Sequence, residues 1–227
     1  MKHVYEGKTK GVYELEDGTF LLKMKDDVTG ENGQIDPGAN SLLGELEGMG
    51  NASLRMSRYY FELLNSKGIP THYLDSNLKE NTMNVRAAQT FEDGLEVICR
   101  FRAYGSFFKR YARYCEKGQL LDSLVEITLK DDERGDPPIS RESLEQLKIM
   151  TAEEYQQVTE MVRKISAIIK EDLESKDLEL YDIKFEFGKI DNQIVLIDDI
   201  SGGNMRVFKD GKQVDPLKLA DIVCKTE

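Results

Sequence analysis

One stretch near the end of the chain, residues 178–208, constrains the fold more than any other, because charges alternate there with apolar side chains. Along its segment "YDIKFEFG", the apolar residues Ile183, Phe185 and Phe187 alternate with the charged residues Asp182, Lys184 and Glu186. Successive side chains of a β-strand point to opposite faces, so this segment predicts a strand with one apolar and one charged face. The returning segment "QIVLIDDIS" is apolar until Asp198 and Asp199. We therefore expect two strands, joined by a polar turn, that carry several carboxylates.

The charged face of this hairpin predicts a site for a divalent metal ion. If the second strand pairs back on the first, Glu186 and Asp198 lie within a side chain's reach of each other, and Lys184 lies close by. Two carboxylates at that separation repel unless a cation sits between them. Mg²⁺, held by one or two carboxylates and by phosphate oxygens, suits such a place. The alternative is a solvated sheet face with ordinary Lys–Glu cross-strand pairs, since the sequence does not determine the register.

The rest of the chain predicts the α+β class, with a mostly antiparallel first half and a long helix in the second half. The expected segments are a β-meander over 1–35 with a turn at Asp17-Gly18, a long loop over 26–40, a helix over 53–64 that stops at Lys67-Gly68, strands over 81–91, 94–106 and 124–130, and a helix opened by Thr151. Glu154 is placed to complete a capping box with Thr151. The 227 residues suffice for one large domain or two small lobes.

Charge and composition exclude several classes of function. The formal net charge of −11 argues against a nucleic-acid-binding protein, because phosphate backbones favour an excess of Lys and Arg. No apolar run approaches the length of a membrane span, and the first residues do not resemble a signal peptide. The two histidines make a zinc site or a Ser-His-Asp triad unexpected, and the three cysteines show no metal-ligand spacing. We expect a cytoplasmic protein that binds neither nucleic acid nor membranes.

Two local basic clusters are candidates for binding an anionic ligand. In "GKTK", residues 7–10, a glycine at a strand-to-strand bend lets backbone N–H groups approach phosphates, and two lysines add charge. In "CRFRAYGSFFKR", residues 99–110, a strand breaks at Gly105-Ser106 and a helix begins, so that Ser106 lies at a helix N-terminus near Arg100 and Lys109. The alternatives are an exposed lysine turn and a basic amphipathic edge.

Six motifs then occur in the order in which one known family has them. They are "YEGKTK" at Tyr5–Lys10, "KDDVT" at Lys25–Thr29, "GIPTH" at Gly68–His72, an arginine and Gly-Ser signature over Glu96–Ser106, "KDD…GDP" over Lys130–Pro137, and "DIKFEFG" at Asp182–Gly188. With these motifs, spread over nearly its whole length, the chain resembles the phosphoribosylaminoimidazole-succinocarboxamide synthase (SAICAR synthetase) family.

The resemblance implies a two-lobed α+β fold and an ATP-dependent carboxylate–amine ligase of purine biosynthesis. An N-terminal, β-rich lobe (1–85) would bind nucleotide, a C-terminal α+β lobe (86–227) would bind substrate and metal, and an ATP cleft would lie between them. With ATP and Mg²⁺, the carboxylate of carboxyaminoimidazole ribonucleotide is phosphorylated, and the amine of L-aspartate then displaces phosphate from the acyl phosphate. Phosphoryl transfer requires mainly positioning and charge neutralisation, and no protein nucleophile is needed. A homodimer is expected by family likeness.

Carried over by motif, the resemblance also implies a role for individual residues. The catalytic residues would be Lys184, Glu186 and Asp198, of which Glu186 and Asp198 would hold Mg²⁺. Lys8, Lys10 and Arg86 would bind ATP. The substrate-binding residues would be Arg100, Ser106, Lys109, Arg206, Asp199 and Ser201. Of these, Arg100, Ser106 and Arg206 would bind the nucleotide substrate, with Ser106 and Arg206 at its phosphate.

Several positions on the substrate side depart from the family pattern. Tyr104 stands where a small residue is usual, Gly94 replaces a proline, Gly202-Gly203 replaces Pro-Asp, Asn51-Ala52 replaces an Asn-Asn pair, and the segment from Asp36 is longer than usual. Two alternatives therefore stay open beside the purine-pathway ligase. One is a divergent ligase with the same acyl-phosphate chemistry on a different carboxylate or amine, and the other is a catalytically silent ATP-binding protein.

Overall fold

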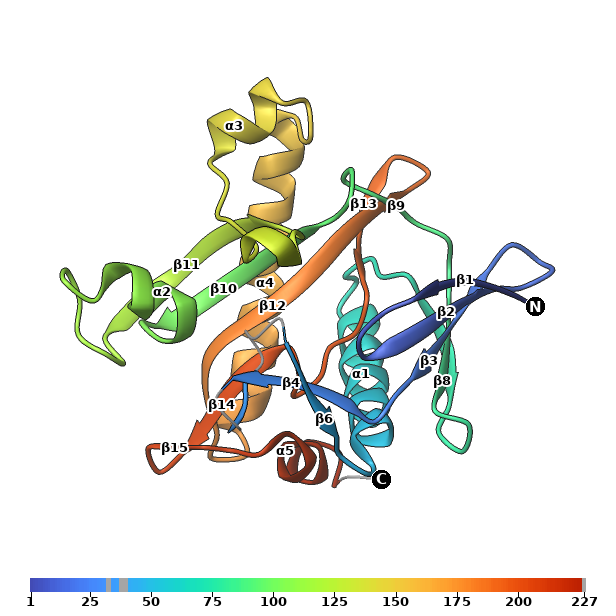
Figure 1. Cartoon of the computed structure of the whole chain (residues 1–227), viewed down its shortest axis with the longest axis horizontal. Coiled ribbons are helices and arrows are strands. Elements are labelled where there is room, and N and C mark those ends of the chain that lie inside the picture. The colour runs from blue at the N-terminus through green and yellow to red at the C-terminus, as the bar shows by residue number, and fades with distance from the viewer. Residues whose placement is uncertain (32–33, 37–40, 226–227) are drawn as a thin grey trace. The chain divides into compact units, whose positions relative to one another are not determined.

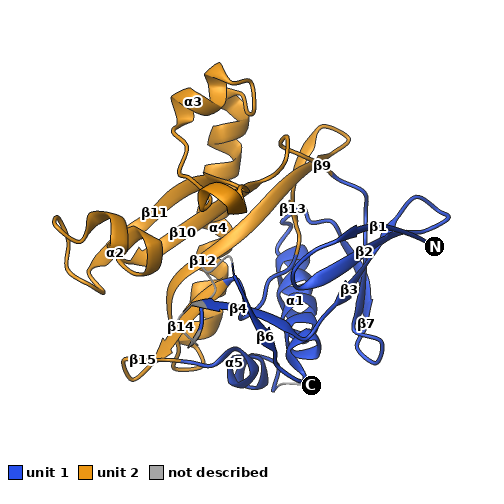
Figure 2. Cartoon of the chain, viewed as in Figure 1, with its two compact units in different colours: residues 1–88, 199–204, 214–227 blue, residues 89–198, 205–213 orange. Residues whose placement is uncertain are grey.

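The computed structural model describes residues 1–31, 34–36 and 41–225, and the described chain divides into two compact units (Figure 2). Unit 1 contains residues 1–88, 199–204 and 214–227, and unit 2 contains residues 89–198 and 205–213. The chain therefore passes twice from the second unit back into the first. It remains a prediction that a lobe over 1–85 binds nucleotide and a lobe over 86–227 binds substrate and metal.

Unit 1 is built on an antiparallel sheet with the strand order β1-β2-β3-β8-β7 (Figure 1). Its strands are β1 (Lys2–Glu6), β2 (Lys10–Glu14), β3 (Phe20–Met24), β7 (Tyr73–Asn77) and β8 (Thr82–Val85). The first three form the expected meander, and the turn between β2 and β3 lies where Asp17-Gly18 predicts it. There Gly18 has a φ of 81°, and the Asp17 carboxylate accepts a hydrogen bond from the backbone N–H of Thr19 at 3.0 Å.

The segment expected as a long loop over 26–40 is in part a small second sheet, in the order β5-β4-β6. Its strands are β4 (Asp27–Glu31), β5 (Gln34–Ile35) and β6 (Leu42–Glu45). The loop prediction was wrong here because β4 finds its partner in β6, with Val28 opposite Gly44, and the sequence alone did not reveal that pairing. Residues 32–33 and 37–40 lie outside the described part of the chain.

Helix α1 (Met49–Ser66) begins four residues before the predicted start at Ser53 and then follows the predicted pattern. Asp26, from a distant segment, accepts hydrogen bonds from the N–H groups of Gly48 at 3.2 Å and Gly50 at 2.8 Å. Because the first N–H groups of a helix lack intrahelical partners, this carboxylate stabilises the extra turn. The helix ends as expected before Gly68, whose φ is 74°. Its apolar face is buried, and it contacts α5 (Pro216–Val223).

Unit 2 is built on a larger antiparallel sheet in the order β11-β10-β12-β14-β15, in which β12 also pairs with β13 and β9. The strands are β9 (Gln89–Thr90), β10 (Leu95–Arg102), β11 (Leu120–Leu129), β12 (Glu179–Ile190), β13 (Gln193–Ile197), β14 (Met205–Lys209) and β15 (Lys212–Gln213). The strand expected over 81–91 is therefore two separate strands, β8 and β9. The other expected strands are confirmed, although β10 ends at Arg102 and β11 begins at Leu120.

The helices of unit 2 are α2 (Gly105–Tyr111), the short 3₁₀ turn η1 (Asp132–Arg134), α3 (Arg141–Gln146) and α4 (Ala152–Glu174). The capping box is confirmed, since the Thr151 hydroxyl accepts from the N–H of Glu154 at 3.2 Å and the Glu154 carboxylate accepts from the N–H of Thr151 at 2.8 Å. Val158, Val162 and Ile165 of helix α4 are buried. The helix lies against β12 and β10 (Figure 1).

The alternating segment forms the centre of this sheet, as β12. Ile183, Phe185 and Phe187 are buried, as the apolar set predicts. The first half of β12 pairs with β14 and the second half with β13, so that the predicted hairpin over 178–208 is three strands. No helix in the described part of the chain is long and apolar enough to cross a membrane.

Candidate active site

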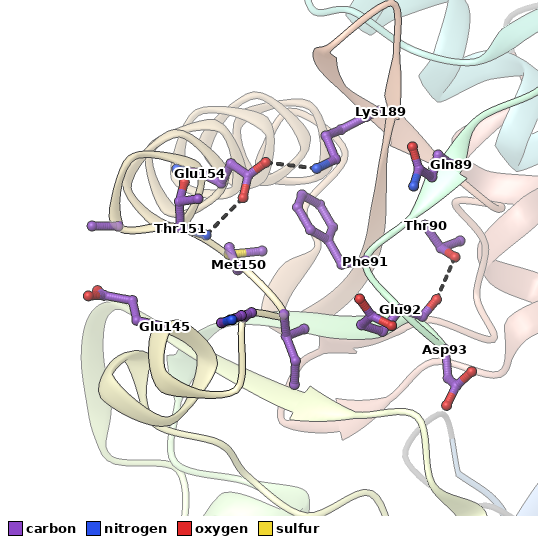
Figure 3. A pocket seen from close by; sticks show the side chains of 13 residues that line it. Gln89, Thr90, Phe91, Glu92, Asp93, Glu145, Met150, Thr151, Glu154 and Lys189 are labelled. Atoms are coloured by element: carbon purple, nitrogen blue, oxygen red, sulfur yellow. Dashed lines mark hydrogen bonds and ion pairs between the residues drawn. The ribbon is translucent and has the colours of Figure 1, made fainter.

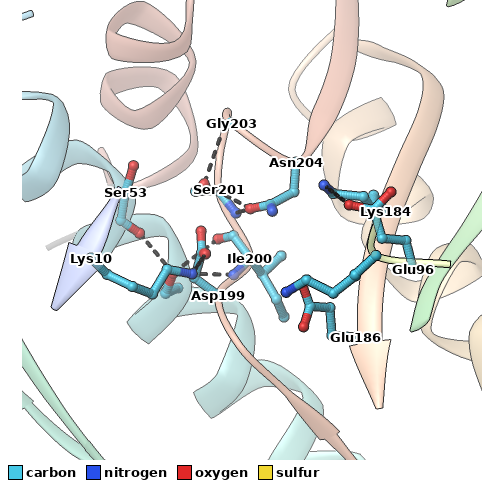
Figure 4. Close-up of polar contacts among 12 residues, drawn as sticks. Lys10, Ser53, Glu96, Lys184, Glu186, Asp199, Ile200, Ser201, Gly203 and Asn204 are labelled. Atoms are coloured by element: carbon cyan, nitrogen blue, oxygen red, sulfur yellow. Dashed lines mark hydrogen bonds and ion pairs between the residues drawn. The ribbon is translucent and has the colours of Figure 1, made fainter. Parts of the chain in front are cut away.

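The charged face of β12 carries two ion pairs side by side. The Lys184 Nζ atom lies 2.6 Å from the Glu96 carboxylate, and the Lys130 Nζ atom lies 2.7 Å from the Glu186 carboxylate (Figure 4 shows Lys184, Glu96 and Glu186). In the register of β10 with β12, Glu96 stands directly opposite Glu186. Like charges opposite each other on a sheet destabilise it unless cations neutralise them. The two lysines neutralise this pair of carboxylates, and Lys–Glu pairs of this kind are also what the alternative of an ordinary sheet face predicts.

Lys184 is held in its charged form by its neighbours. Burial lowers the pKa of its ammonium, but the negative charges of Glu96, Glu186 and Asp198 outweigh burial and raise the pKa above the ordinary lysine value. Lys184 therefore carries a full positive charge at neutral pH, and it loses that charge only as the pH rises through the raised pKa.

Asp198 lies where the sequence places it, one residue after the end of β13. Ile197 is opposite Glu186, and Asp198 has a φ of 69°, so the chain leaves the sheet directly after the residue that pairs with Glu186. The negative charges of Glu186 and Asp198 both help to raise the pKa of Lys184. Among the described residues no group of three or more His, Cys, Asp or Glu side chains is arranged to hold a metal. The two carboxylates fit Mg²⁺, which takes one or two protein carboxylates and completes its shell with phosphate oxygens and water.

A second cluster of charges surrounds Arg100, whose side chain is only 2% exposed. Its guanidinium donates to Glu126 at 2.5 Å, to Asp182 at 3.1 Å and to the Ser106 hydroxyl at 3.1 Å. Arg206 donates to both oxygens of Asp182, at 3.0 and 2.9 Å. The predicted substrate residues Arg100, Ser106 and Arg206 are thus brought together in unit 2. Sequence reasoning did not assign a role to Asp182, which joins the two arginines.

The start of helix α2 supports this cluster through a glycine. Gly105 has a φ of 53°, and a Cβ atom there would lie 2.7 Å from the guanidinium carbon of Arg206. Only glycine tolerates both conditions, so Gly105 lets Arg206 lie against the first turn of α2. Ser106 follows in that turn, which confirms the predicted break from strand to helix. Lys109 is exposed on the same helix.

Tyr104, one of the departures, is part of an aromatic cluster. Its ring packs edge-on against Tyr181 and Phe208, and the guanidinium of Arg206 lies 6.0 Å from its centroid. The ammonium of Lys117 lies 4.7 Å from the same ring. The tyrosine therefore packs against the side of the arginine cluster.

The predicted residues in unit 1 lie in two places. Lys8 lies in the turn between β1 and β2, and Lys10 is the first residue of β2. The N–H of Gly7 donates to the carbonyl of Lys10 across this turn at 2.8 Å. Lys10 forms an ion pair with Asp199, which the sequence analysis had assigned separately to the substrate. Arg86 donates to the backbone carbonyl of Thr71 at 2.5 Å.

The segment after Asp199 is a tight turn held by its own side chains. The Ser201 hydroxyl contacts the Asn204 side-chain oxygen at 2.8 Å and accepts from the N–H of Gly203 at 3.2 Å. A small cavity of about 60 Å³ in unit 1 is lined by this turn and by residues around β4, among them Thr9, Lys25, Asp27, Ser53, Asp199 and Ser201. The described structure thus places two of the predicted substrate residues at one cavity.

Local packing explains the glycine at position 202, another departure from the family pattern. A Cβ atom at this position would lie 2.8 Å from the Cβ of Pro216 and 2.9 Å from its Cα, at the first turn of α5. A larger residue would push against that helix, so glycine here follows from local packing. A Cβ at Gly203 would meet only the Ser201 hydroxyl, at 3.3 Å.

A cavity of about 720 Å³ lies elsewhere in unit 2 (Figure 3). It is lined by residues 89–93, residues around the start of α4 and Lys189, which pairs with Glu154 at 2.8 Å. None of the predicted site residues lines it, so its size alone does not make it the active site.

Solved structures with the same fold extend over almost the whole chain. A structural-genomics SAICAR synthetase superimposes with a TM-score of 0.84 at 34% identity, covering 98% of this chain and 96% of that one. A type-2 SAICAR synthetase in complex with ADP gives a TM-score of 0.86 at 27% identity, covering 99% and 98%. The α+β class with antiparallel sheets is thereby confirmed.

The sequence relatives give the family. The model of the SAICAR synthetase family matches residues 3–219. The phosphoribosylaminoimidazole-succinocarboxamide synthase of Clostridium tetani (strain Massachusetts / E88) is 56% identical over 225 residues, which are 98% of this chain and 99% of that protein. The enzyme of the same name from Sulfurisphaera tokodaii is 36% identical, over 91% of this chain and 83% of its own length. The chain belongs to the SAICAR synthetase family.

Proposed function

We propose that this chain is an ATP-dependent carboxylate–amine ligase that joins carboxyaminoimidazole ribonucleotide to L-aspartate in purine biosynthesis. The observation that carries the proposal is the 56% identity, over 98% of this chain, to a protein named for that reaction. The comparisons give no support to a different carboxylate or amine. One of the departures behind that alternative, Gly202, is explained by its contact with Pro216.

The reaction begins with transfer of the γ-phosphoryl group of ATP to the substrate carboxylate. The amine of aspartate then attacks the acyl phosphate, a C–N bond forms, and inorganic phosphate leaves. Lys8, Lys10 and Arg86 bind ATP in this proposal, and the ADP complex of a related synthetase supports the choice of nucleotide. Glu186 and Asp198 hold Mg²⁺, which when bound neutralises charge on the phosphates.

Lys184 is suited to neutralise the group in transfer, because the surrounding carboxylates keep it protonated. Arg100, Ser106, Lys109 and Arg206 bind the nucleotide substrate, with Ser106 and Arg206 at its phosphate. Asp182 and Glu126 fix the Arg100 guanidinium before the substrate arrives, so that less side-chain entropy is lost on binding. Asp199 and Ser201 contribute to the substrate side. The proposal also includes a cytoplasmic homodimer.

The test of this function is the release of ADP from the purified protein. With carboxyaminoimidazole ribonucleotide, ATP and Mg²⁺, full turnover should require L-aspartate, and the amide product should accumulate in equal amount to ADP. Efficient turnover with wild-type protein, not improved in a Gly203→Asp variant, would show that the glycine pair does not redirect the enzyme. Turnover of another acid or amine, with none of this pair, would overturn the proposal.

A Lys8→Ala substitution tests the nucleotide side. If the turn between β1 and β2 holds the phosphates, the variant should bind ATP about 1–3 kcal/mol more weakly, the range for a charge-assisted hydrogen bond. Titration calorimetry with ATP measures the change. Lys2→Ala is the matched control, because Lys2 lies in the same strand pair and its side chain is 80% exposed. Equal ATP affinity in both variants would mean that the turn is an ordinary surface feature.

A further inference from the structure

The side chain of Lys130, just after the end of β11, contacts the charged face of β12. The function proposed above assigns no role to this residue. It follows the last residue of β11, and its Nζ atom lies 2.7 Å from the Glu186 Oε1 atom. Its side chain is 41% exposed, whereas the Glu186 side chain is 13% exposed. A partly hydrated cation thus touches one of the two carboxylates assigned to the metal.

The backbone between the two residues is built to let this contact form. Strand β10 lies between β11 and β12, with Leu95 opposite Leu129 and Glu96 opposite Glu186. Gly94, just before β10, has a φ of 106°, and a Cβ atom there would lie 2.8 Å from the Lys130 Cδ atom. The lysine stem therefore passes over Gly94 on its way to Glu186. A proline, whose φ is fixed near −65°, could not adopt this conformation.

The charges on this face show why a cation is required at Glu186. Glu96 and Glu186 are cross-strand neighbours, and Lys184 makes its direct contact with Glu96. Lys130 makes its contact with Glu186. Without a cation at Glu186, the two opposed carboxylates would repel each other. Lys130 supplies that cation from within the chain.

We propose that Lys130 competes with the divalent ion for Glu186. Its ammonium is paired with the Glu186 carboxylate in the metal-free protein and is displaced when the metal binds. This inference rests on the proposed role of Glu186 as a metal ligand. Displacement is inexpensive because the lysine is already partly hydrated, and exposed ion pairs contribute little to stability. The lysine thereby keeps the carboxylate in place between turnovers and lowers the affinity of the site for metal without nucleotide.

The test measures binding of Mn²⁺ alone by electron paramagnetic resonance, so that it does not depend on activity. Lys130→Gln should bind Mn²⁺ about two- to fivefold more tightly than the wild type, since the competing ion pair is worth at most that factor. Lys189→Gln is the matched control, because it removes the same charge from an ion pair with Glu154 elsewhere in unit 2. It should leave Mn²⁺ affinity unchanged. Unchanged or weaker binding in Lys130→Gln would overturn the inference.

Two further measurements separate this inference from the function on which it rests. Glu186→Gln should weaken Mn²⁺ binding, and unchanged binding in that variant would remove Glu186 from the metal site itself. If Glu186→Gln weakens binding and Lys130→Gln has no effect, only the competition is wrong. A crystal structure with Mn²⁺ should show the Lys130 Nζ atom beyond hydrogen-bonding distance of Glu186. Persistence of the 2.7 Å contact beside a bound ion would mean that lysine and metal share the carboxylate.

Discussion

Glu186→Gln and Asp198→Asn will each lower Mg²⁺-dependent turnover by about 10²–10³-fold, the loss typical of removing one preorganised electrostatic contact to a transition state. Each change keeps the shape of the side chain and removes its charge, so the metal loses a ligand while the packing is kept. Steady-state release of ADP over a range of Mg²⁺ concentrations measures the effect.

The fold should survive both substitutions, because neither side chain belongs to the apolar core. Glu179→Gln is a suitable control, since Glu179 lies on the same strand and pairs with Arg102 at a site where the two side chains are 45% and 28% exposed. It should keep near-wild-type turnover. Near-wild-type turnover in Glu186→Gln or Asp198→Asn would remove that residue from the metal site.

Asp182→Asn will destabilise unit 2 by about 3–5 kcal/mol, the cost of leaving a buried charge without its partner. The Asp182 side chain is 4% exposed, and it is shared by Arg100 and Arg206, which are 2% and 7% exposed. An amide cannot neutralise two guanidinium groups, so their positive charges would repel each other in a place that excludes water. For a chain of this length, the melting temperature should fall by roughly 6–20 °C.

Thermal and urea unfolding of Asp182→Asn and of the control Glu179→Gln measure this effect. Glu179→Gln again serves for comparison, because removing a partly exposed ion pair should change the free energy of unfolding by less than about 1 kcal/mol. If Asp182→Asn were as mild as this control, Glu126 alone would suffice to neutralise Arg100. The affinity of Asp182→Asn for the nucleotide substrate, measured where the protein is still folded, should also fall, because both arginines lose their fixed orientation.

The sequence predicted those parts of the fold that depend on neighbours along the chain. The alternation over residues 181–188, the capping box at Thr151 and the break at Gly105 each follow from local stereochemistry, and the structure confirms all three. The early start of α1 was missed because its capping carboxylate, Asp26, is contributed by a segment more than twenty residues away. The sequence predicts a loop where β4 lies, because the strand forms by pairing with β6 and its own residues do not indicate that pairing.

The candidate site shows the same limit. Lys184, Glu186 and Asp198 could be placed together because a hairpin brings them together. Lys130 and Glu186 are separated by 56 positions in the sequence, and Lys10 and Asp199 by 189. The periodicity of a sequence does not predict contacts over such separations. The alternation predicts Asp182 on the charged face of β12, but it does not predict that this carboxylate is buried between Arg100 and Arg206.

The central position of β12 has a consequence for how the protein acquires its activity. Its pairing partners come from residues 89–90, 96–100, 193–197 and 205–208, so this strand cannot be completed before segments more than eighty positions apart have met. Contacts of such long range form slowly, because loop closure costs entropy before the contacts stabilise the chain. A slip by one residue would also send Lys184 and Glu186 into the core and bring Phe185 to the surface. We therefore expect no partly folded form of unit 2 to bind metal, so that the recovery of Mn²⁺ binding during refolding should coincide with the final folding step.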